Sequence, residues 1–167
     1  IITRNQSPDL PFQQTINPYR GCEHGCIYCY ARPTHAYLGL SPGLDFETKL
    51  TVKPNAADLL RRELMAKNYQ CSILSLGANT DPYQPIERDH KLTRQILKVM
   101  LEFSHPVNIV TKSSMIERDI DILKQLAQKQ LVYVQLSITT LDKTLARKLE
   151  PRASSPQRRL QSISTLK

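Results

Sequence analysis

Short apolar segments at 72–76, 107–110 and 131–138 alternate with stretches whose apolar residues recur at helical spacing. An earlier segment, 13–17, is the candidate for a further strand ahead of them. Parallel strands need a long crossover between them, usually a helix, so this alternation is typical of βα units around a parallel sheet. The pattern therefore predicts an α/β fold.

The helical stretches between the strands can be placed from the same periodicity. Apolar residues recur at helical spacing in four stretches: 56–64, 92–103, 116–127 and 158–166. Ser114 and Glu117 form a capping-box pattern at the start of the third stretch. Residues 46–52 predict a short extended segment, and a Pro- and Ser-rich loop is expected after the last strand.

The number of strands limits how far the sheet can close. Strand centres near 15, 74, 109 and 135 give four βα units, whereas a closed (β/α)₈ barrel takes about 250 residues. We therefore expect one domain over residues 1–167 that forms part of a TIM-type barrel, with the later strands missing and an edge that further chain would cover. Residues 1–16 are expected to form an extended lead-in, because Pro8 and Pro11 interrupt any periodic pattern.

The composition is ordinary for a globular chain and sets few limits on function. Of 167 residues, 40% are apolar, and 23 Lys and Arg against 15 Asp and Glu give a net charge of +8. Such an excess suits nucleic acid, a small anionic ligand or solubility alone. Because no run of 18 apolar residues is present, we expect no membrane span. The chain begins with Ile1 and shows no secretory pattern, so we expect a cytoplasmic protein of which this is a piece.

Three of the four cysteines, Cys22, Cys26 and Cys29, lie in one short segment with the spacing C-x₃-C-x₂-C. Three thiolates on one loop can hold three irons of a 4Fe–4S cluster, whereas ordinary electron-carrying clusters have four cysteines. The fourth iron would then lack a protein ligand and could bind a small molecule. An open coordination position is typical of catalytic metal sites.

A structural zinc site completed by His24 or Cys71 is the alternative for the same cysteines. Cys71 precedes the strand at 72–76, whereas the three-cysteine segment follows a strand, so the two should lie at opposite ends of the sheet. We expect Cys71 to be a small buried residue. His24 is separated from Cys22 and from Cys26 by a single residue each, which is too tight for a comfortable tetrahedron.

The cysteine spacing, with the aromatic Tyr28 before the third cysteine, resembles that of the radical S-adenosylmethionine (SAM) enzymes. The words NPYRGCEHGCIYCYARPTH, GANTDPYQPIE, TKSS and LEPRASSPQRRL resemble the branch related to spore photoproduct lyase, over residues 17–167. The resemblance implies a 4Fe–4S cluster on Cys22, Cys26 and Cys29 whose open iron binds SAM. It also implies a flavodoxin- or ferredoxin-like electron donor and reductive cleavage of SAM to a 5′-deoxyadenosyl radical that takes hydrogen from a substrate.

The same resemblance implies which residues contact SAM. Tyr28 matches an aromatic near the adenine, and the segment Asn79, Thr80 and Asp81 matches the loop at the methionine amino end. Lys112 would meet the SAM carboxylate, because a cation that faces an interior needs an anionic partner. Ser137 matches the ribose position, and Arg159 resembles an Arg aimed at the methionine carboxylate. No residue is predicted to act in catalysis directly.

A basic cluster near the C-terminus supports a second hypothesis, a non-catalytic nucleic-acid-binding protein whose cysteines hold a metal or Fe–S group. The cluster comprises Arg147, Lys148, Arg152, Arg158 and Arg159. Such residues can neutralise phosphates, and likeness to a DNA-repair lyase makes a nucleic-acid-related substrate or partner a further option. Glu150 and Arg152 are expected to form a local ion pair. Substrate choice would depend on later strands that this chain lacks.

Overall fold

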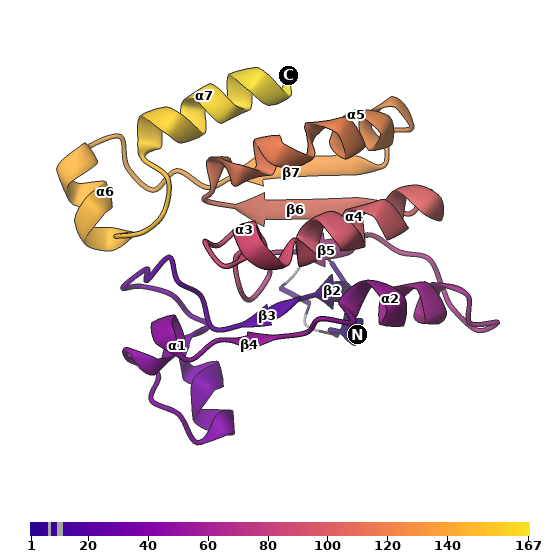
Figure 1. Ribbon diagram of the computed structural model, residues 1–167, viewed down its shortest axis with the longest axis horizontal. Helices are drawn as coiled ribbons and strands as arrows, with labels where there is room; N and C mark the ends of the chain where they lie inside the picture. The colour runs from indigo at the N-terminus through magenta and orange to yellow at the C-terminus, as the bar shows by residue number, and fades with distance from the viewer. Residues whose placement is uncertain (7, 10–11) are drawn as a thin grey trace.

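A computed structural model describes residues 1–6, 8–9 and 12–167 of the chain. Its main sheet has the order β1-β2-β5-β6-β7 (Figure 1). The strands are β1 (Thr3–Arg4), β2 (Gln14–Ile16), β5 (Leu74–Leu76), β6 (Val107–Thr111) and β7 (Val132–Leu136). β2, β5, β6 and β7 run parallel, and β1 joins β2 in antiparallel orientation. The predicted α/β architecture with four parallel strands is confirmed.

The strand register places one row of apolar side chains under the crossover helices. Ile16 pairs with Leu76, and Leu76 with Ile109, and all three are fully buried. Residues of four helical segments complete this core. These segments are α2 (Ala56–Leu64), α4 (Leu92–Glu102), η2 (Ser114–Asp119) and α5 (Ile120–Gln128). Because these helices pack on the face of the sheet rather than over the strand ends, the strand ends remain available for a site.

The segment between β2 and β5 differs from the prediction of an extended stretch over 46–52. It contains η1 (Arg32–Leu38), a short helix α1 (Asp45–Thr48) and then β4 (Thr51–Val52), which pairs with β3 (Tyr19–Arg20). Helix α1 forms because Phe46 becomes buried and the Asp45 carboxylate accepts a hydrogen bond from the Ser41 amide at 3.0 Å. Only the end of the predicted stretch is a strand.

The observed helix starts also differ from the predicted ones. Ser113, not Ser114, caps η2, because its hydroxyl accepts from the Met115 amide at 3.2 Å. The expected loop after β7 contains a helix, α6 (Lys143–Leu149), whose cap Asp142 accepts from two amides. The last helix, α7 (Pro156–Leu166), begins two residues early, because Pro156 suits the first helical position. A short α3 (Glu87–His90) precedes α4.

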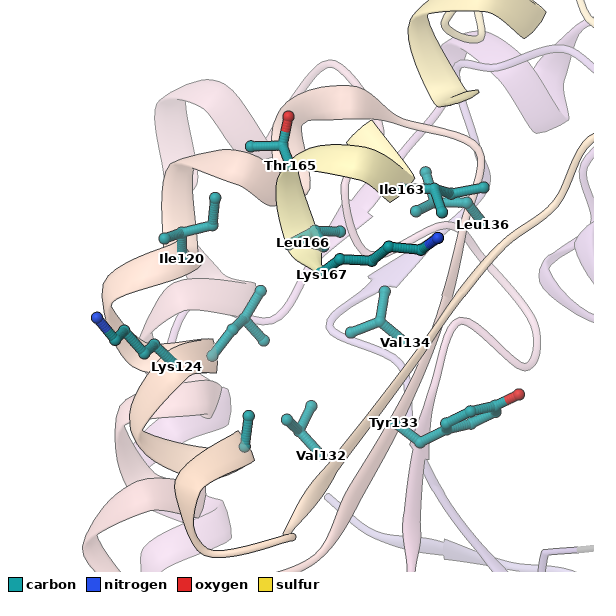
Figure 2. Close-up of a pocket in the computed structure, with 12 residues that line it drawn as sticks. Ile120, Lys124, Val132, Tyr133, Val134, Leu136, Ile163, Thr165, Leu166 and Lys167 are labelled. Carbon is teal, nitrogen blue, oxygen red and sulfur yellow. The ribbon is translucent and has the colours of Figure 1, made fainter. Parts of the chain in front are cut away.

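The two ends of the sheet behave differently. The predicted lead-in over 1–16 contains β1 and β2, which pair with each other, while residues 7, 10 and 11 lie outside the described part. At the other edge, the described residues provide β7 with one neighbour, β6. An apolar groove of about 620 Å³ lies between α5, β7 and α7 (Figure 2). Val132, Val134 and Leu136 face this groove, and Tyr133 projects from the other side of β7.

Candidate metal centre

The cysteine loop, residues 21–30, leaves β3 through a glycine that no other residue could replace without strain. Gly21 has φ +80°, and an added Cβ would lie 2.8 Å from the Phe46 carbonyl oxygen. The next residue, Cys22, donates its amide to that same carbonyl at 2.9 Å. The loop is therefore held against α1 at its first cysteine.

All three thiols of the loop are free, and they are close enough to affect one another electrostatically. Cys22 and Cys26 are buried and Cys29 is half-buried. Burial raises the pKa of the Cys26 thiol to about 12 and also raises that of Cys29. Because only thiolates bind metals, these thiols need a cationic group beside them to ionise. That donor set fits an iron–sulfur cluster.

The two candidate fourth ligands of the zinc alternative, His24 and Cys71, are placed differently. Within residues 1–6, 8–9 and 12–167, no three His, Cys, Asp or Glu side chains, the three cysteines included, converge on a single ion site. Cys71 precedes β5 at the end opposite to the cysteine loop, as predicted. It is exposed rather than buried, because β5 begins only at Leu74 and the residues before it lie at the surface. His24 pairs with Asp81 and also lies beside the Cys22 thiol.

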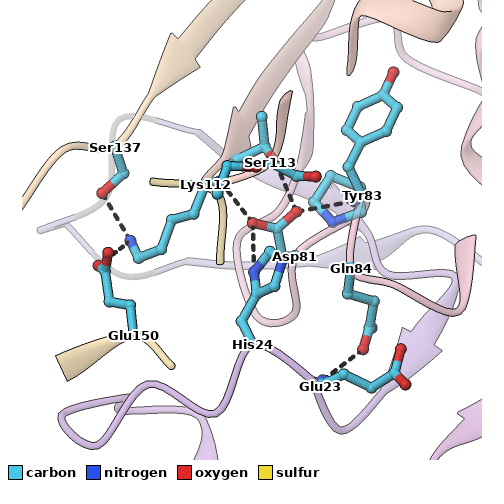
Figure 3. A network of polar contacts seen from close by, with 12 residues as sticks. Glu23, His24, Asp81, Tyr83, Gln84, Lys112, Ser113, Ser137 and Glu150 are labelled. Carbon is cyan, nitrogen blue, oxygen red and sulfur yellow. Dashed lines mark hydrogen bonds and ion pairs between the residues drawn. The ribbon is translucent and has the colours of Figure 1, made fainter. Parts of the chain in front are cut away.

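His24 and Asp81 form a buried ion pair between the cysteine loop and the loop after β5 (Figure 3). His24 Nδ1 lies 3.3 Å from Asp81 Oδ2, with side chains only 3% and 9% exposed. Burial disfavours the protonated imidazole, but the carboxylate outweighs burial and raises the pKa of His24 to about 10. Burial alone would raise the pKa of Asp81, but His24 and its hydrogen-bond donors lower it. The charge and hydrogen bonds of the Asp81 carboxylate are therefore provided by partners within the protein.

The three residues expected at the methionine end of SAM differ in exposure. The Thr80 hydroxyl donates to the Tyr19 carbonyl at 3.1 Å, and Thr80 is 2% exposed. Asp81 is directed to His24 and to the end of β6. Asn79 is half-buried, and its amide donates to Asn17 Oδ1 at 3.2 Å. Of the three side chains, only that of Asn79 is partly open to a ligand.

Lys112, directly after β6, reaches across to the end of β7 (Figure 3). Its Nζ donates to Ser137 Oγ at 2.7 Å and lies 3.7 Å from Glu150 Oε1. The same ammonium is 5.9 Å from the centroid of the Tyr28 ring. The structure thus gathers Tyr28, Lys112 and Ser137 beside the cysteine loop, although they come from three separate parts of the chain.

Glu150 is the central residue of this group, although the sequence predicted for it only a local ion pair with Arg152. Its carboxylate accepts hydrogen bonds from Tyr28 and Thr139 and pairs with Arg159 at 2.5 Å. Burial alone would raise the pKa of Glu150, but these partners lower it. The expected Glu150–Arg152 pair does not form, because Arg152 pairs with Glu47. The only signal in the sequence was an acid within the segment LEPRASSPQRRL.

Arg159 is buried behind Glu150 and is 1% exposed. Besides Glu150, it donates to the carbonyls of Ser137 and Ser154, both at 2.7 Å. Its guanidinium thus holds the end of β7 and the loop before α7. Lys112 and Arg159 together carry two positive charges against the single charge of Glu150, so this group carries an excess positive charge that an anionic ligand would neutralise.

The five residues of the basic cluster do not form one surface. Arg159 is buried, and Arg158 donates to both carboxylate oxygens of Glu117 at 2.6 and 2.7 Å. Arg152 pairs with Glu47. Three of the five residues are thus bound by carboxylates, whereas Arg147 and Lys148 are exposed at the end of α6. In the part of the chain that the structure describes, no helix is long and apolar enough to cross a membrane.

Comparison with known proteins gives one family and several relatives. The model of the Radical SAM superfamily matches residues 16–167. An uncharacterised protein of Mycobacterium tuberculosis is 40% identical over 158 residues, which are 95% of this chain and 46% of the relative. An uncharacterised protein of Methanocaldococcus jannaschii is 33% identical over 152 residues, 90% of this chain and 54% of the relative. The chain therefore spans about half the length of the curated relatives it matches.

Solved structures of spore photoproduct lyase share the fold. The enzyme complexed with dinucleoside spore photoproduct superposes with a TM-score of 0.62 at 18% identity. The match covers 98% of this chain and 44% of that one. This agrees with the partial barrel predicted from the strand count.

Proposed function

Since the chain belongs to the radical SAM superfamily, whose enzymes use a 4Fe–4S cluster and SAM, we propose that Cys22, Cys26 and Cys29 hold the cluster. Together the two cofactors supply reductive cleavage of SAM to methionine and a 5′-deoxyadenosyl radical, which takes hydrogen from a substrate. The support in this structure is the donor set: three free, mostly buried thiols on one loop that influence one another electrostatically.

Lys112 is the proposed partner of the SAM carboxylate. It lies at the C-terminal end of β6 beside the cysteine loop, and its side chain is 19% exposed. Lys112 and Arg159 carry two positive charges against the one negative charge of Glu150. This excess is the single observation that carries the assignment, because a buried charge without a partner is costly. Ser137, which now accepts from the ammonium, would turn its hydroxyl toward the ribose.

The other predicted contacts divide into direct and indirect ones. Tyr28 is 48% exposed, and its hydroxyl is fixed by Glu150, so its ring is oriented for stacking on the adenine. Asn79 contributes at the methionine amino end. Arg159 acts through Glu150 and Ser137 rather than by direct contact, because its guanidinium is already bound by protein groups.

Reduction of the cluster requires an external electron donor, and we propose a flavodoxin- or ferredoxin-like protein. A nucleic-acid-related substrate also stays a prediction. It is supported by the net charge of +8 and by the fold shared with a lyase whose structure holds a dinucleoside spore photoproduct.

Anaerobic reconstitution of the chain with iron and sulfide tests the proposal. We expect about four irons per chain and an electron paramagnetic resonance (EPR) signal of the reduced cluster that changes when SAM is added. Lys112→Gln should lose the SAM response and keep the iron, whereas Lys124→Gln, on α5, should behave as wild type. One zinc per chain without a response to SAM would overturn the proposal in favour of the metal-binding alternative.

A further inference from the structure

Asp81 stands out because its buried carboxylate is surrounded entirely by donors from its own chain. Oδ1 accepts from the Thr111 hydroxyl at 2.7 Å and from the Tyr83 amide at 2.9 Å. Oδ2 accepts from the Lys112 amide at 2.7 Å and lies 3.3 Å from His24 Nδ1. An ionised carboxylate offers about four lone-pair positions. Three hydrogen bonds and one ion pair occupy these positions, so the Asp81 carboxylate is bound by its own chain rather than directed to a ligand.

One oxygen of Asp81 joins the two halves of the proposed cofactor site (Figure 3). His24 lies between Cys22 and Cys26 in the cysteine loop, and Lys112 is the proposed partner of the SAM carboxylate. Both meet Oδ2: His24 through its ring and Lys112 through its backbone amide. One buried oxygen therefore contacts both the cysteine loop and the backbone at the end of β6.

The loop has further ties to the segment after β5. The Glu23 amide donates to Gln84 Oε1 at 2.9 Å, and Gln84 Nε2 donates to the Gly21 carbonyl at 3.1 Å. These contacts hold the loop to its neighbour but do not reach β6. The His24–Asp81 pair connects the loop to the Lys112 backbone, whereas Tyr28 of the same loop meets the Lys112 side chain.

We propose that His24 and Asp81 are positioning residues that align the cluster-binding loop with the SAM-binding end of β6. This inference rests on the proposed function and replaces the direct SAM contact expected for Asp81. Its physical basis is that small misplacements of reacting groups are costly, and a loop shift of about 1 Å can reduce catalysis about a hundredfold. A loop that the His24–Asp81 pair holds in place avoids that loss.

Asp119 provides a matched control. It too is a buried carboxylate, and it pairs with Arg94 and Arg118 and accepts from Tyr83. Arg94 lies on α4 and Arg118 on η2, whereas Tyr83 reaches Asp119 through its hydroxyl and donates its backbone amide to Asp81. Asp119→Asn therefore removes a buried carboxylate and leaves the four contacts of Asp81 in place.

The experiment compares Asp81→Asn, His24→Gln and Asp119→Asn in the reconstituted chain. The readouts are iron per chain, the SAM-induced EPR change and the SAM dissociation constant. Asp81→Asn and His24→Gln should each weaken SAM binding at least about tenfold, equivalent to about 1.4 kcal/mol, and reduce the EPR change. The double variant should be no worse than the more affected single variant, because both changes break one contact. Asp119→Asn should lower thermal stability and leave SAM binding unchanged.

The inference fails if Asp81→Asn and His24→Gln bind SAM as Asp119→Asn does. His24→Gln keeps the test decisive if Asp81→Asn does not fold, because His24 can be replaced without removing the hydrogen bonds of Asp81 to Thr111, Tyr83 and Lys112. Wild-type protein that binds iron without responding to SAM would overturn the proposed function, and this inference with it. A wild type that responds, with unaffected variants, overturns the inference alone.

Discussion

Glu150→Gln should destabilise the fold far more than a typical loss of charge. The substitution keeps the size of the side chain but removes the anion that pairs with Arg159, and the two side chains are 2% and 1% exposed. Removing one partner of a buried pair costs about 3–5 kcal/mol, because the remaining charge is left without compensation. At about 2–4 °C per kcal/mol for a chain of this size, the melting temperature should fall by about 6–20 °C.

The assay is thermal unfolding of the chain followed by circular dichroism, with Glu117→Gln as control. Glu117 also pairs with an arginine, Arg158, but these side chains are 22% and 41% exposed. Exposed pairs contribute about 0–1 kcal/mol. The two variants remove the same charge from pairs of similar distance, so their difference measures burial.

A loss in Glu150→Gln no larger than that in Glu117→Gln would refute the reasoning. A second variant tests the cause: Glu150→Gln combined with Arg159→Gln removes both charges of the pair. It should recover part of the stability lost in Glu150→Gln, because no buried guanidinium is then left alone. An additive loss in the double variant would show that the charges do not interact.

Three further predictions concern the loop, the ligand and pH. Gly21→Ala should lower stability by more than about 1 kcal/mol and reduce iron uptake. Gly39→Ala, at φ +69° with nothing within 4 Å of the added Cβ, should lose stability through backbone strain alone and keep its iron uptake. Equal iron uptake in the two variants would contradict this. Lys112→Gln should raise the SAM dissociation constant at least about tenfold in calorimetric titration, and wild-type affinity in that variant would remove Lys112 from the site. Burial lowers the pKa of His105 below its ordinary 6.5, so the unfolded chain takes up a proton at this residue before the folded chain does as pH falls. Urea unfolding should therefore show the free energy of unfolding declining from pH 6.5 downward, until the lower folded-state pKa is passed. His105→Gln should flatten that slope, and an unchanged slope would assign it to other groups.

Much of the fold could be predicted from periodicity, because a buried strand or helix face needs apolar residues at regular intervals. Residues 72–76 and 107–110 and the helix over 56–64 are examples, and the structure places strands or a helix in each. Short elements were predicted less well. Helix α1 depends on burial of Phe46 beside Cys22, a contact that residues 46–52 do not themselves reveal.

The candidate site divides in the same way. The three cysteines lie within eight residues, so their spacing alone predicted a common loop and its metal chemistry. The partners of Glu150 and Asp81 were not predictable from the sequence. Glu150 pairs with Arg159 rather than with the nearer Arg152, and Asp81 pairs with His24, 57 residues away in the chain. Local spacing encodes which groups share a loop or a helix face. Only the tertiary structure decides which buried charges meet at the strand ends, since each must find a partner among the residues that packing brings within reach.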